Sequence, residues 1–308
     1  MNSNLTPPRT VRDWVLSAER RFQAAGLYFG HGTDNARDEA AWLVCAALGI
    51  ESAHLDAELE RELTPAQHQK ILDLVEARIA TRKPLAYLLH EAWFAGLRFY
   101  VDERVLVPRS LLGEFIRERF QPWIDPQRVR VALDLCTGSG CIAVALARAF
   151  PEARIDAADI SDAALAVARI NIAAHGLDGR VRAILSDLFA GLGAERYDLI
   201  VTNPPYVDAA DLASLPAEYR REPRLALAAG RQGLDVINRI LAQAADRLTP
   251  GGILVAEVGN SRAALQAAFP GVAFTWLTDS QGDESVFLLG AEDLARHRPL
   301  FAAALNPR

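Results

Sequence analysis

The sequence predicts an α/β protein, with a doubly wound, mostly parallel seven-stranded sheet preceded by a small helical domain and a linking β-hairpin. Three observations predict this fold class. Apolar residues recur at helical spacing over residues 1–90, and a segment rich in aromatic and β-branched residues follows. From residue 128 onward, short apolar runs alternate with helical stretches. The 308 residues, 51% of them hydrophobic, are enough for two packed domains.

Three helices are predicted in the N-terminal part of the chain. The first begins near residue 11, and the second is predicted over residues 34–48. The third begins at Thr64, where Pro65 at the first helical position and Gln67 at the third form a capping signature. These elements predict a helical domain over residues 1–90.

The next segment, residues 91–127, is predicted to link two domains. Residues 93–107 are rich in aromatic and β-branched residues and contain Gly96 and a turn candidate at Asp102-Glu103, which predicts a β-hairpin. Ser110 is placed to cap a helix that continues to Phe120.

Residues 128–308 are predicted to form the second domain, in which strands and helices alternate as in a parallel sheet covered on both faces. The link over residues 278–284 is too short for a helical crossover, so the last two strands should be antiparallel. The predicted strands are 129–135, 153–158, 181–185, 197–202, 252–258, 272–277 and 285–289, and the main helices are 141–150, 162–175, 234–248 and 262–269.

Composition excludes several classes of protein. No apolar run reaches the roughly 18 residues of a membrane helix, and the polar N-terminus predicts no secretion signal. Three cysteines without CxxC spacing predict neither a disulfide framework nor a zinc site, and we expect no metal and a reducing, cytoplasmic location. The net charge of -6 speaks against nucleic acid as the main ligand.

A glycine-rich turn follows the first strand of the second domain and opens a helix. Glycines there let the backbone approach a ligand beside the positive end of a helix. A dinucleotide site or a plain βα turn fits the glycines alone, but an acid at the strand end favours S-adenosylmethionine, whose ammonium group needs such a partner. The expected cofactor contacts in this turn are Asp134, Cys136, Thr137, Gly138, Ser139 and Gly140.

Two further acids follow the next two strands. Asp159 lies about 20 residues past the glycines, where an acid accepts hydrogen bonds from both ribose hydroxyls; a helix cap is the alternative role. We include its neighbour Ile160 among the cofactor contacts. Asp187 is placed to accept the adenine amino group while Leu188 packs on the ring, although a solvated loop acid would give the same pattern.

The tetrapeptide Asn203-Pro204-Pro205-Tyr206 ends the fourth strand on the ligand side of such a sheet. Two prolines fix the backbone and remove two donors. The Asn203 amide and the Pro204 carbonyl are placed to hold a planar NH2 group while Tyr206 packs on its flat face. Hydrogen bonds to both hydrogens would favour pyramidalisation of the nitrogen toward a methyl group. An ordinary proline turn is the alternative.

On these residues the chain resembles the glutamine-specific protein methyltransferases. The tetrapeptide also occurs in adenine amino-group DNA methyltransferases, but residues 92–110 resemble the hairpin that joins the helical and catalytic domains of the glutamine enzymes. Within that family the chain is closer to the enzyme acting on the third protein of the large ribosomal subunit, because Ser110 replaces the proline typical of the release-factor enzyme. Residues 218–223 and 229–234 also match the family.

The resemblance implies a class I S-adenosylmethionine-dependent methyltransferase fold in residues 128–308 and a substrate-recognition role for residues 1–90. It implies catalytic contacts from Asn203, Pro204, Pro205 and Tyr206, with Asn203 also touching the cofactor. Cys136 stands where the family commonly has glycine, so we expect ordinary backbone angles there.

The predicted reaction is methyl transfer to the side-chain amide nitrogen of a glutamine, in a ribosomal protein that is not yet assembled. The acidic chain would not repel a free basic protein. Release-factor methylation is the nearest alternative. DNA adenine methylation is a weaker alternative, because the sequence has no obvious target-recognition domain and base flipping usually needs a basic cleft. The intact tetrapeptide speaks against a non-catalytic assembly factor, and a nicotinamide dehydrogenase does not explain it. We expect no nucleic-acid requirement and no membrane partner.

Overall fold

The computed structural model describes residues 8–305 and divides the chain into two compact units. The helical unit comprises Met1–Glu91 together with Pro216–Arg221, and the catalytic unit comprises Ala92–Leu215 and Glu222–Arg308. Among the described residues, no helix combines the length and apolar character needed to span a bilayer.

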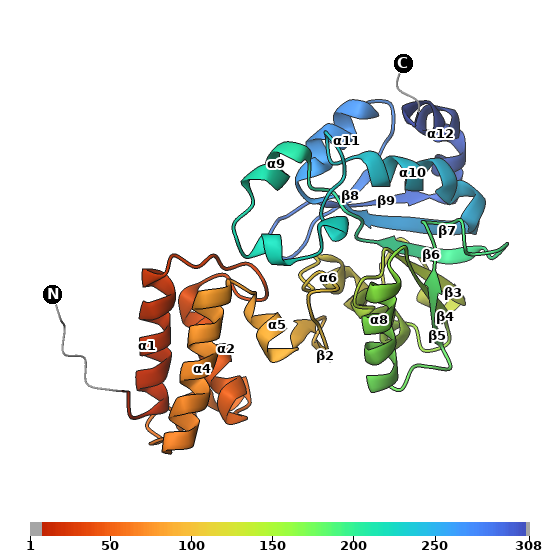
Figure 1. Cartoon of the computed structure of the whole chain (residues 1–308). Helices are drawn as coiled ribbons and strands as arrows, with labels where there is room; N and C mark the ends of the chain where they lie inside the picture. Colours follow the sequence, from red (N-terminus) through yellow and green to blue (C-terminus); the bar gives the residue numbers. More distant parts are fainter. Residues whose placement is uncertain (1–7, 306–308) are drawn as a thin grey trace. The chain divides into compact units, whose positions relative to one another are not determined.

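Most of the helical unit is formed by its three long helices, α1, α2 and α4, which lie side by side in Figure 1. The predicted capping signature is confirmed, since the Thr64 side chain accepts from the Gln67 amide and Gln67 bonds back to the Thr64 amide. The second helix begins after Asn35, whose side chain accepts from the Asp38 amide, slightly later than predicted. The elements are α1 (Val11–Ala24), α2 (Ala36–Leu48), η1 (Ser52–His54), α3 (Leu55–Glu58), α4 (Pro65–Thr81) and α5 (Leu85–Leu89).

A short hairpin opens the catalytic unit. Strands β1 (Ala92–Phe94) and β2 (Leu97–Phe99) pair antiparallel around a two-residue turn with positive φ at both positions, the geometry that suits a tight hairpin. The predicted extension to residue 107 is wrong. The Tyr100 amide donates to Asn171 Oδ1 (2.7 Å), and Asn171 Nδ2 donates to the Tyr100 carbonyl (2.9 Å), so a side chain replaces the partner strand.

The helix after this hairpin, α6 (Leu112–Arg117), is also shorter than predicted. The residue that caps α6 is Leu111, without a side-chain hydrogen bond, so the prediction that Ser110 caps this helix is wrong. Ser110 lies one residue earlier, where its Oγ accepts from the Leu112 amide at 3.2 Å.

The main sheet has seven strands in the order β5-β4-β3-β6-β7-β9-β8. Strand β9 runs antiparallel to both of its neighbours and every other pair is parallel, which confirms the predicted mixed sheet. The strands are β3 (Val131–Leu135), β4 (Arg154–Asp159), β5 (Val181–Leu185), β6 (Tyr197–Thr202), β7 (Leu248–Glu257), β8 (Thr275–Leu277) and β9 (Val286–Gly290).

Helices cover both faces of this sheet, and the alternation of side chains along each strand separates two cores (Figure 1). On β3, Ala132 packs in one core and Leu133 in the other. One face is covered by α6, α7 (Cys141–Ala149) and α8 (Asp162–Ala174), and the other by α10 (Asp235–Ala244), α11 (Arg262–Ala268) and α12 (Ala291–Ala304).

The order of the strands decides where a ligand binds. Strand β3 lies between β4 and β6. The chain passes from β3 to β4 and β5 on one side and then crosses to β6 on the other, so the order of the strands reverses beside β3. In open α/β sheets, ligands bind outside the carboxyl ends of the strands at this switch point.

Candidate active site

A cavity lies at the carboxyl ends of β3, β4 and β6 and is lined by residues of the catalytic unit alone. Ten of the fourteen predicted site residues meet there, whereas Asp134, Gly140, Pro204 and Tyr206 do not line it. Those that line the cavity are Cys136, Thr137, Gly138, Ser139, Asp159, Ile160, Asp187, Leu188, Asn203 and Pro205.

Gly138 and Gly140, in the turn after β3, have different structural roles. Gly138 has a φ of +54°, and a Cβ added there would meet no atom within 4 Å, so its free side faces the open cavity. Gly140 has a φ of +79°, and its added Cβ would lie 3.1 Å from Ala168 Cβ on α8. Gly140 therefore allows the close packing of the turn on α8, and it is not among the lining residues.

Asp134 lies beneath the turn and does not line the cavity as a cofactor contact would. The Thr137 hydroxyl and the Ala143 amide donate to its Oδ2, the latter at 2.9 Å. Burial, opposed in part by these hydrogen bonds and reinforced by the charge of Asp159, raises the pKa of Asp134 to about 7. The structure thus places Asp134 as a support of the turn.

Cys136 contradicts the expectation of ordinary backbone angles. Its φ is +64°, in the left-handed region that glycine adopts at little cost and other residues at about 1–2 kcal/mol. Burial, together with the charges of Asp159 and Asp134, raises the pKa of its thiol well above the usual range. A thiol that stays protonated is a poor nucleophile, so the environment of Cys136 suits a part of the turn and not a nucleophile.

Asp159 ties the turn after β3 to the end of β4. Its Oδ2 accepts from the Gly138 amide and its Oδ1 from the Ser161 amide, both at 2.9 Å. Burial raises its pKa above the usual range, against the effect of these backbone hydrogen bonds. Each carboxylate oxygen accepts more than one hydrogen bond, so both remain able to accept from a diol in the cavity. The adjacent Ile160 is 52% exposed and offers an apolar surface to the same space.

The turn after β5 is held by Ser186. Its hydroxyl donates to the Leu188 carbonyl (2.5 Å) and accepts from the Gly191 amide (2.8 Å). This fixes Leu188 with a φ of +49° at the cavity wall. Asp187 forms an ion pair with Arg239 (2.8 Å), a lining residue that the sequence analysis did not single out.

The tetrapeptide begins directly after Thr202, the last residue of β6. Thr202 Oγ1 donates to the Leu135 carbonyl at the end of β3 (2.7 Å), so the ends of these two strands are joined by a side-chain hydrogen bond. Asn203 and Pro205 line the cavity, whereas Pro204 and Tyr206 are not among its lining residues.

Tyr206 packs against residues on both sides of β7 in the sequence, Gly233 before it and Gly259 and Ser261 after it. Ser261 Oγ donates to the Tyr206 carbonyl at 2.8 Å. The Tyr206 ring lies so close to Gly259 that a Cβ added there would be 2.4 Å from Tyr206 Cε2. Gly233 is equally confined, since its Cβ would lie 2.2 Å from the Tyr206 carbonyl oxygen. The lack of a Cβ at both Gly259 and Gly233 therefore allows Tyr206 to lie where it does.

A further part of the cavity wall comes from residues 104–110 and 223–228, which we did not predict as site residues. Glu222 joins them. Its two oxygens accept from Arg109 Nη1 and Nη2, each at 2.7 Å, and Oε1 also accepts from the Val107 amide at 3.0 Å. Residues 104–110 lie in the stretch 92–110 that carried the family resemblance, so that resemblance could have identified them. Residues 223–228 lie between its two shorter matches, 218–223 and 229–234, and share only Pro223 with them.

Glu257 buries a second carboxylate behind this wall, at the end of β7. Its Oε2 accepts from Ser110 Oγ (2.5 Å) and from the Leu111 amide (3.1 Å). Burial raises the pKa of Glu257 to about 7 despite these hydrogen bonds.

The charges around the cavity fit a ligand without a pyrophosphate. Its lining contains three arginines, and a carboxylate holds each of them, in the pairs Arg104–Asp102, Arg109–Glu222 and Arg239–Asp187. An acid suited to a ribose diol, an open glycine turn and the Asn-Pro-Pro-Tyr end of β6 complete the cavity. With the seven-stranded sheet, these features define a class I methyltransferase.

Comparisons with known proteins agree with that class. Residues 119–217 match the methyltransferase small domain, and residues 13–89 match the PrmC N-terminal domain. The hMettl16 catalytic domain, solved in complex with an RNA hairpin, has a similar fold, with a TM-score of 0.50 and 18% identity over 75% of this chain and 84% of that one.

Three curated relatives define the family. Ribosomal protein uL3 glutamine methyltransferase of Burkholderia pseudomallei is 49% identical over 96% of this chain and 98% of its own length. The proteins of that name from Neisseria meningitidis (49% identity, 92% and 94% covered) and Bordetella pertussis (45% identity, 95% and 99% covered) are similarly close. The chain belongs to the ribosomal protein uL3 glutamine methyltransferase family.

Proposed function

We propose that this protein transfers a methyl group from S-adenosylmethionine to the side-chain amide nitrogen of a glutamine in ribosomal protein uL3. The observation that carries the proposal is the meeting of Asn203 and Pro205 with Gly138 and Asp159 in one cavity. One part of that cavity suits the methyl donor and the other suits a planar amide. Identity of 45–49% to uL3 glutamine methyltransferases over nearly the whole chain supports the choice of substrate.

The residues present fit the cofactor. Asp159 would accept from the ribose hydroxyls, Ile160 and Leu188 would pack against the adenine, and Asp187 would accept from its amino group. The turn at Gly138 leaves room for the amino-acid part beside the first turn of α7. When bound, the cofactor supplies a methyl group already activated by its sulfonium charge.

Asn203 and Pro204 would act on the substrate amide. An amide nitrogen is a poor nucleophile because its lone pair is delocalised into the carbonyl. Acceptance of its two hydrogens by Asn203 Oδ1 and the Pro204 carbonyl favours a pyramidal nitrogen whose lone pair faces the methyl carbon. The bound cofactor would supply the methyl carbon to this nitrogen and keep the electron pair of the methyl–sulfur bond, and the nitrogen would release a proton to solvent while Asn203 and the Pro204 carbonyl hold the amide.

Most of the acceleration of methyl transfer would come from positioning the substrate amide. The described residues that line the cavity include no histidine, and a dedicated base is not needed because the nitrogen becomes acidic only as the new bond forms. Two prolines, the Tyr206 carbonyl bonded to Ser261 and the ring against Gly259 hold the tetrapeptide in one geometry.

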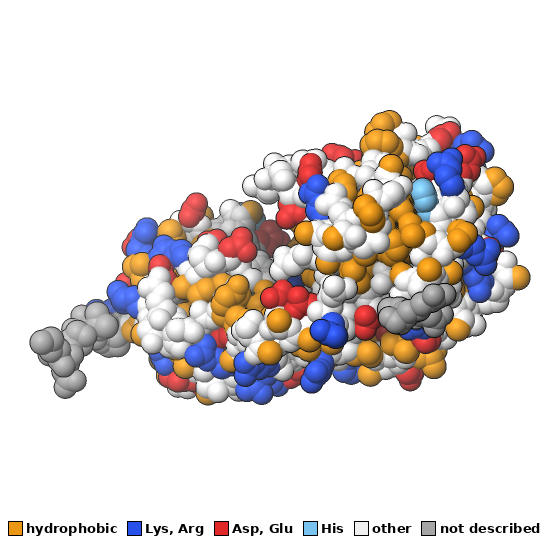
Figure 2. Space-filling view, turned by 90° about the horizontal axis from the view of Figure 1, so that it is seen from above, with side chains coloured by type: hydrophobic (Ala, Val, Ile, Leu, Met, Phe, Trp, Pro, Cys, Tyr) orange, Lys and Arg blue, Asp and Glu red, His pale blue; other side chains and the backbone are white. Residues whose placement is uncertain are grey.

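Charge supports an unassembled protein as the substrate. The chain carries a net charge of -6, and the face in Figure 2 shows Lys and Arg side chains interspersed with Asp and Glu. A free basic ribosomal protein is not repelled by such a chain, whereas the polyanionic assembled subunit is a poorer partner. Residues 1–90 would contribute to recognition of that protein, and the reaction would take place in the cytoplasm.

The experiment offers two purified proteins, uL3 and a release factor, to the enzyme with isotopically labelled S-adenosylmethionine. We expect label on a glutamine of uL3 and at least tenfold less on the release factor. Preferential labelling of the release factor would transfer the assignment to that substrate. Labelling of neither protein, with cofactor binding intact, would contradict the proposed function.

A further inference from the structure

The chain enters the helical unit a second time, ten residues after the catalytic tetrapeptide along the sequence. It leaves the catalytic unit after Leu215, packs as part of the helical unit over Pro216–Arg221 and returns at Glu222. We call residues 216–221 the tether and residues 223–228, which follow it, the return segment. The tether lies between Asn203–Tyr206 and a wall of the same cavity along the chain.

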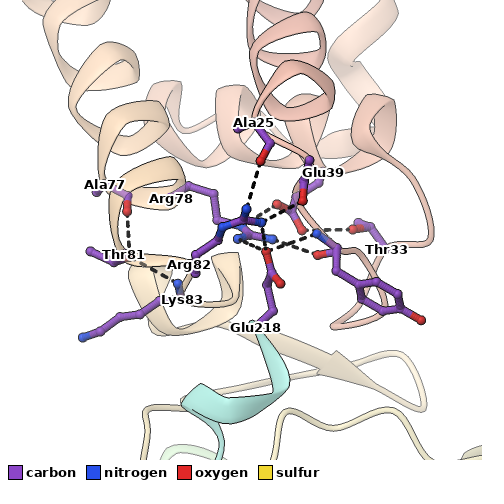
Figure 3. Close-up of polar contacts among 11 residues, drawn as sticks. Ala25, Thr33, Glu39, Ala77, Arg78, Thr81, Arg82, Lys83 and Glu218 are labelled. Atoms are coloured by element: carbon purple, nitrogen blue, oxygen red, sulfur yellow. Dashed lines mark hydrogen bonds and ion pairs between the residues drawn. The ribbon is translucent and has the colours of Figure 1, made fainter. Parts of the chain in front are cut away.

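Glu218 fixes the tether inside the helical unit (Figure 3). Its side chain is only 1% exposed. Its Oε1 accepts from Arg82 Nη1 at 2.9 Å and from the Tyr28 amide at 3.1 Å, and it lies 3.6 Å from Arg78 Nη1. Two hydrogen-bond donors and the longer ion-pair contact of Arg78, from two separate parts of the helical unit, therefore converge on one carboxylate oxygen.

The surrounding charges are balanced, which a buried group of this kind requires. Arg78 is 1% exposed and donates from Nε to Glu39 (2.7 Å) and from Nη2 to the Tyr28 carbonyl (3.1 Å). Arg82 also donates to the carbonyls of Ala25 and Gly26. Burial opposes ionisation of Glu218, but the hydrogen bonds from Arg82 and the Tyr28 amide outweigh it and hold its pKa below the usual range.

The next residue strengthens the anchor. The Tyr219 ring packs edge-on against Tyr28 at 5.6 Å between centroids and lies 4.4 Å from the His31 ring. Gly30 makes room for it, because a Cβ there would be 2.8 Å from the Tyr219 hydroxyl.

Glu222 fixes the other end of the tether in the catalytic unit. Its buried carboxylate holds Arg109 and the Val107 amide, as described above. The return segment is then bonded to the residue that follows the tetrapeptide, since the Val207 amide donates to the Leu227 carbonyl and the Ala229 amide donates to the Val207 carbonyl, both at 2.9 Å.

We propose that Glu218 is a positioning residue for methyl transfer. By fixing the tether on the helical unit, it fixes the return segment and, through the bonds to Val207, the Asn203–Tyr206 backbone. The helical domain then contributes to the geometry of the reaction itself, in addition to any surface that it offers to the substrate. The inference rests on the proposed function and deepens it.

The test compares the full-length wild type with Glu218→Gln, which keeps the shape and removes the charge. Glu76→Gln is the matched control, because Glu76 also pairs with an arginine but is exposed on α4. Three quantities are measured: kcat and KM for whole uL3 and for a short peptide containing its target glutamine, the Kd of S-adenosylmethionine, and amide hydrogen exchange over residues 216–229.

We expect Glu218→Gln to lower kcat at least tenfold for both substrates, with the cofactor Kd within twofold of wild type. Exchange should accelerate at least tenfold at the amides of Ala226, Ala228 and Ala229, which are bonded in the wild type. A loss confined to whole uL3 would show that Glu218 serves only protein recognition and would overturn the proposal. Unchanged kcat or unchanged exchange in the return segment would also overturn it.

The proposed function and this inference fail in different ways. If wild type methylates no protein, the proposed function fails, and exchange in the return segment still tests the tether. If Glu218→Gln does not fold, Arg82→Lys replaces it, because Arg82 is 32% exposed and lysine keeps the charge while losing the fork of donors. The same kcat loss and faster exchange are expected from that variant, and their absence overturns the proposal.

Discussion

Gly259→Ala should reduce turnover about a hundredfold while leaving the cofactor affinity unchanged. The added Cβ would lie 2.4 Å from Tyr206 Cε2 and 2.7 Å from Cζ, whereas ordinary contact begins near 3.4 Å. The ring must therefore retreat by about 1 Å, and the Tyr206 carbonyl bonded to Ser261 moves with it. A misplacement of ~1 Å at a reacting centre costs ~10²-fold in rate, about 2.7 kcal/mol of barrier.

The control for this prediction is Gly282→Ala. Gly259 and Gly282 both have positive φ, +45° and +86°, so alanine strains the backbone at either position. At Gly282 the new Cβ meets no atom within 4 Å, so that variant reports strain without the clash. The assay is steady-state methyl transfer to uL3 at saturating S-adenosylmethionine, with the cofactor Kd measured by calorimetry. Turnover of Gly259→Ala within twofold of Gly282→Ala would refute the positional role of the Tyr206 ring.

Three further variants test other parts of the site. Asp159→Ala should weaken S-adenosylmethionine binding at least tenfold in calorimetry, because the diol acceptor and the tie to the glycine turn are both lost; an unchanged Kd would contradict the ribose role. For Glu257 the folded pKa of about 7 exceeds the ordinary 4.5, so wild-type stability should fall as pH rises from about 4.5 to 7. In Glu257→Gln, the fall in the free energy of unfolding between these pH values, measured with urea, should be smaller by up to about 3 kcal/mol. The part of the fall that comes from Asp134, whose pKa is also raised to about 7, should remain. A pH dependence identical to that of wild type would contradict the role of Glu257. Cys136→Gly should leave the thermal midpoint within a few degrees of wild type, because relief of the left-handed backbone strain offsets the added entropy of the unfolded chain. Cys136→Val should destabilise the protein by about 2 kcal/mol or more. Equal thermal midpoints for the two variants would argue against backbone strain at this position.

The sequence was sufficient to predict the order and pairing of the main elements. Thr64, Pro65 and Gln67 mark a helix start through local hydrogen bonding alone, and the short link over residues 278–284 is enough to reverse β9. The hairpin prediction failed at Tyr100 because a side chain distant in sequence, Asn171, takes the hydrogen bonds of a partner strand. Helix α12 was not predicted, and Pro299 interrupts its helical pattern.

The candidate site was predictable where it depends on strand ends, since the carboxyl ends of parallel strands meet at one edge of the sheet. Asn203, Asp159 and Gly138 are in that class. The positive φ of Cys136 was not predictable, because residue type argues against it and only the packed turn enforces it. The roles of Glu218 and Glu222 required tertiary structure, since their partners lie more than a hundred residues away.

The most direct test of the central claim locates the transferred methyl group. The enzyme is incubated with uL3 and deuterated-methyl S-adenosylmethionine, and tandem mass spectrometry of the digested product identifies the modified atom, with Asn203→Ala run in parallel. We expect a single methyl on a glutamine side-chain nitrogen with wild type. With Asn203→Ala we expect at least a hundredfold loss of turnover, while the cofactor Kd stays within a few-fold of wild type. A methyl on another residue type, or near-wild-type turnover by Asn203→Ala with cofactor bound, would contradict it.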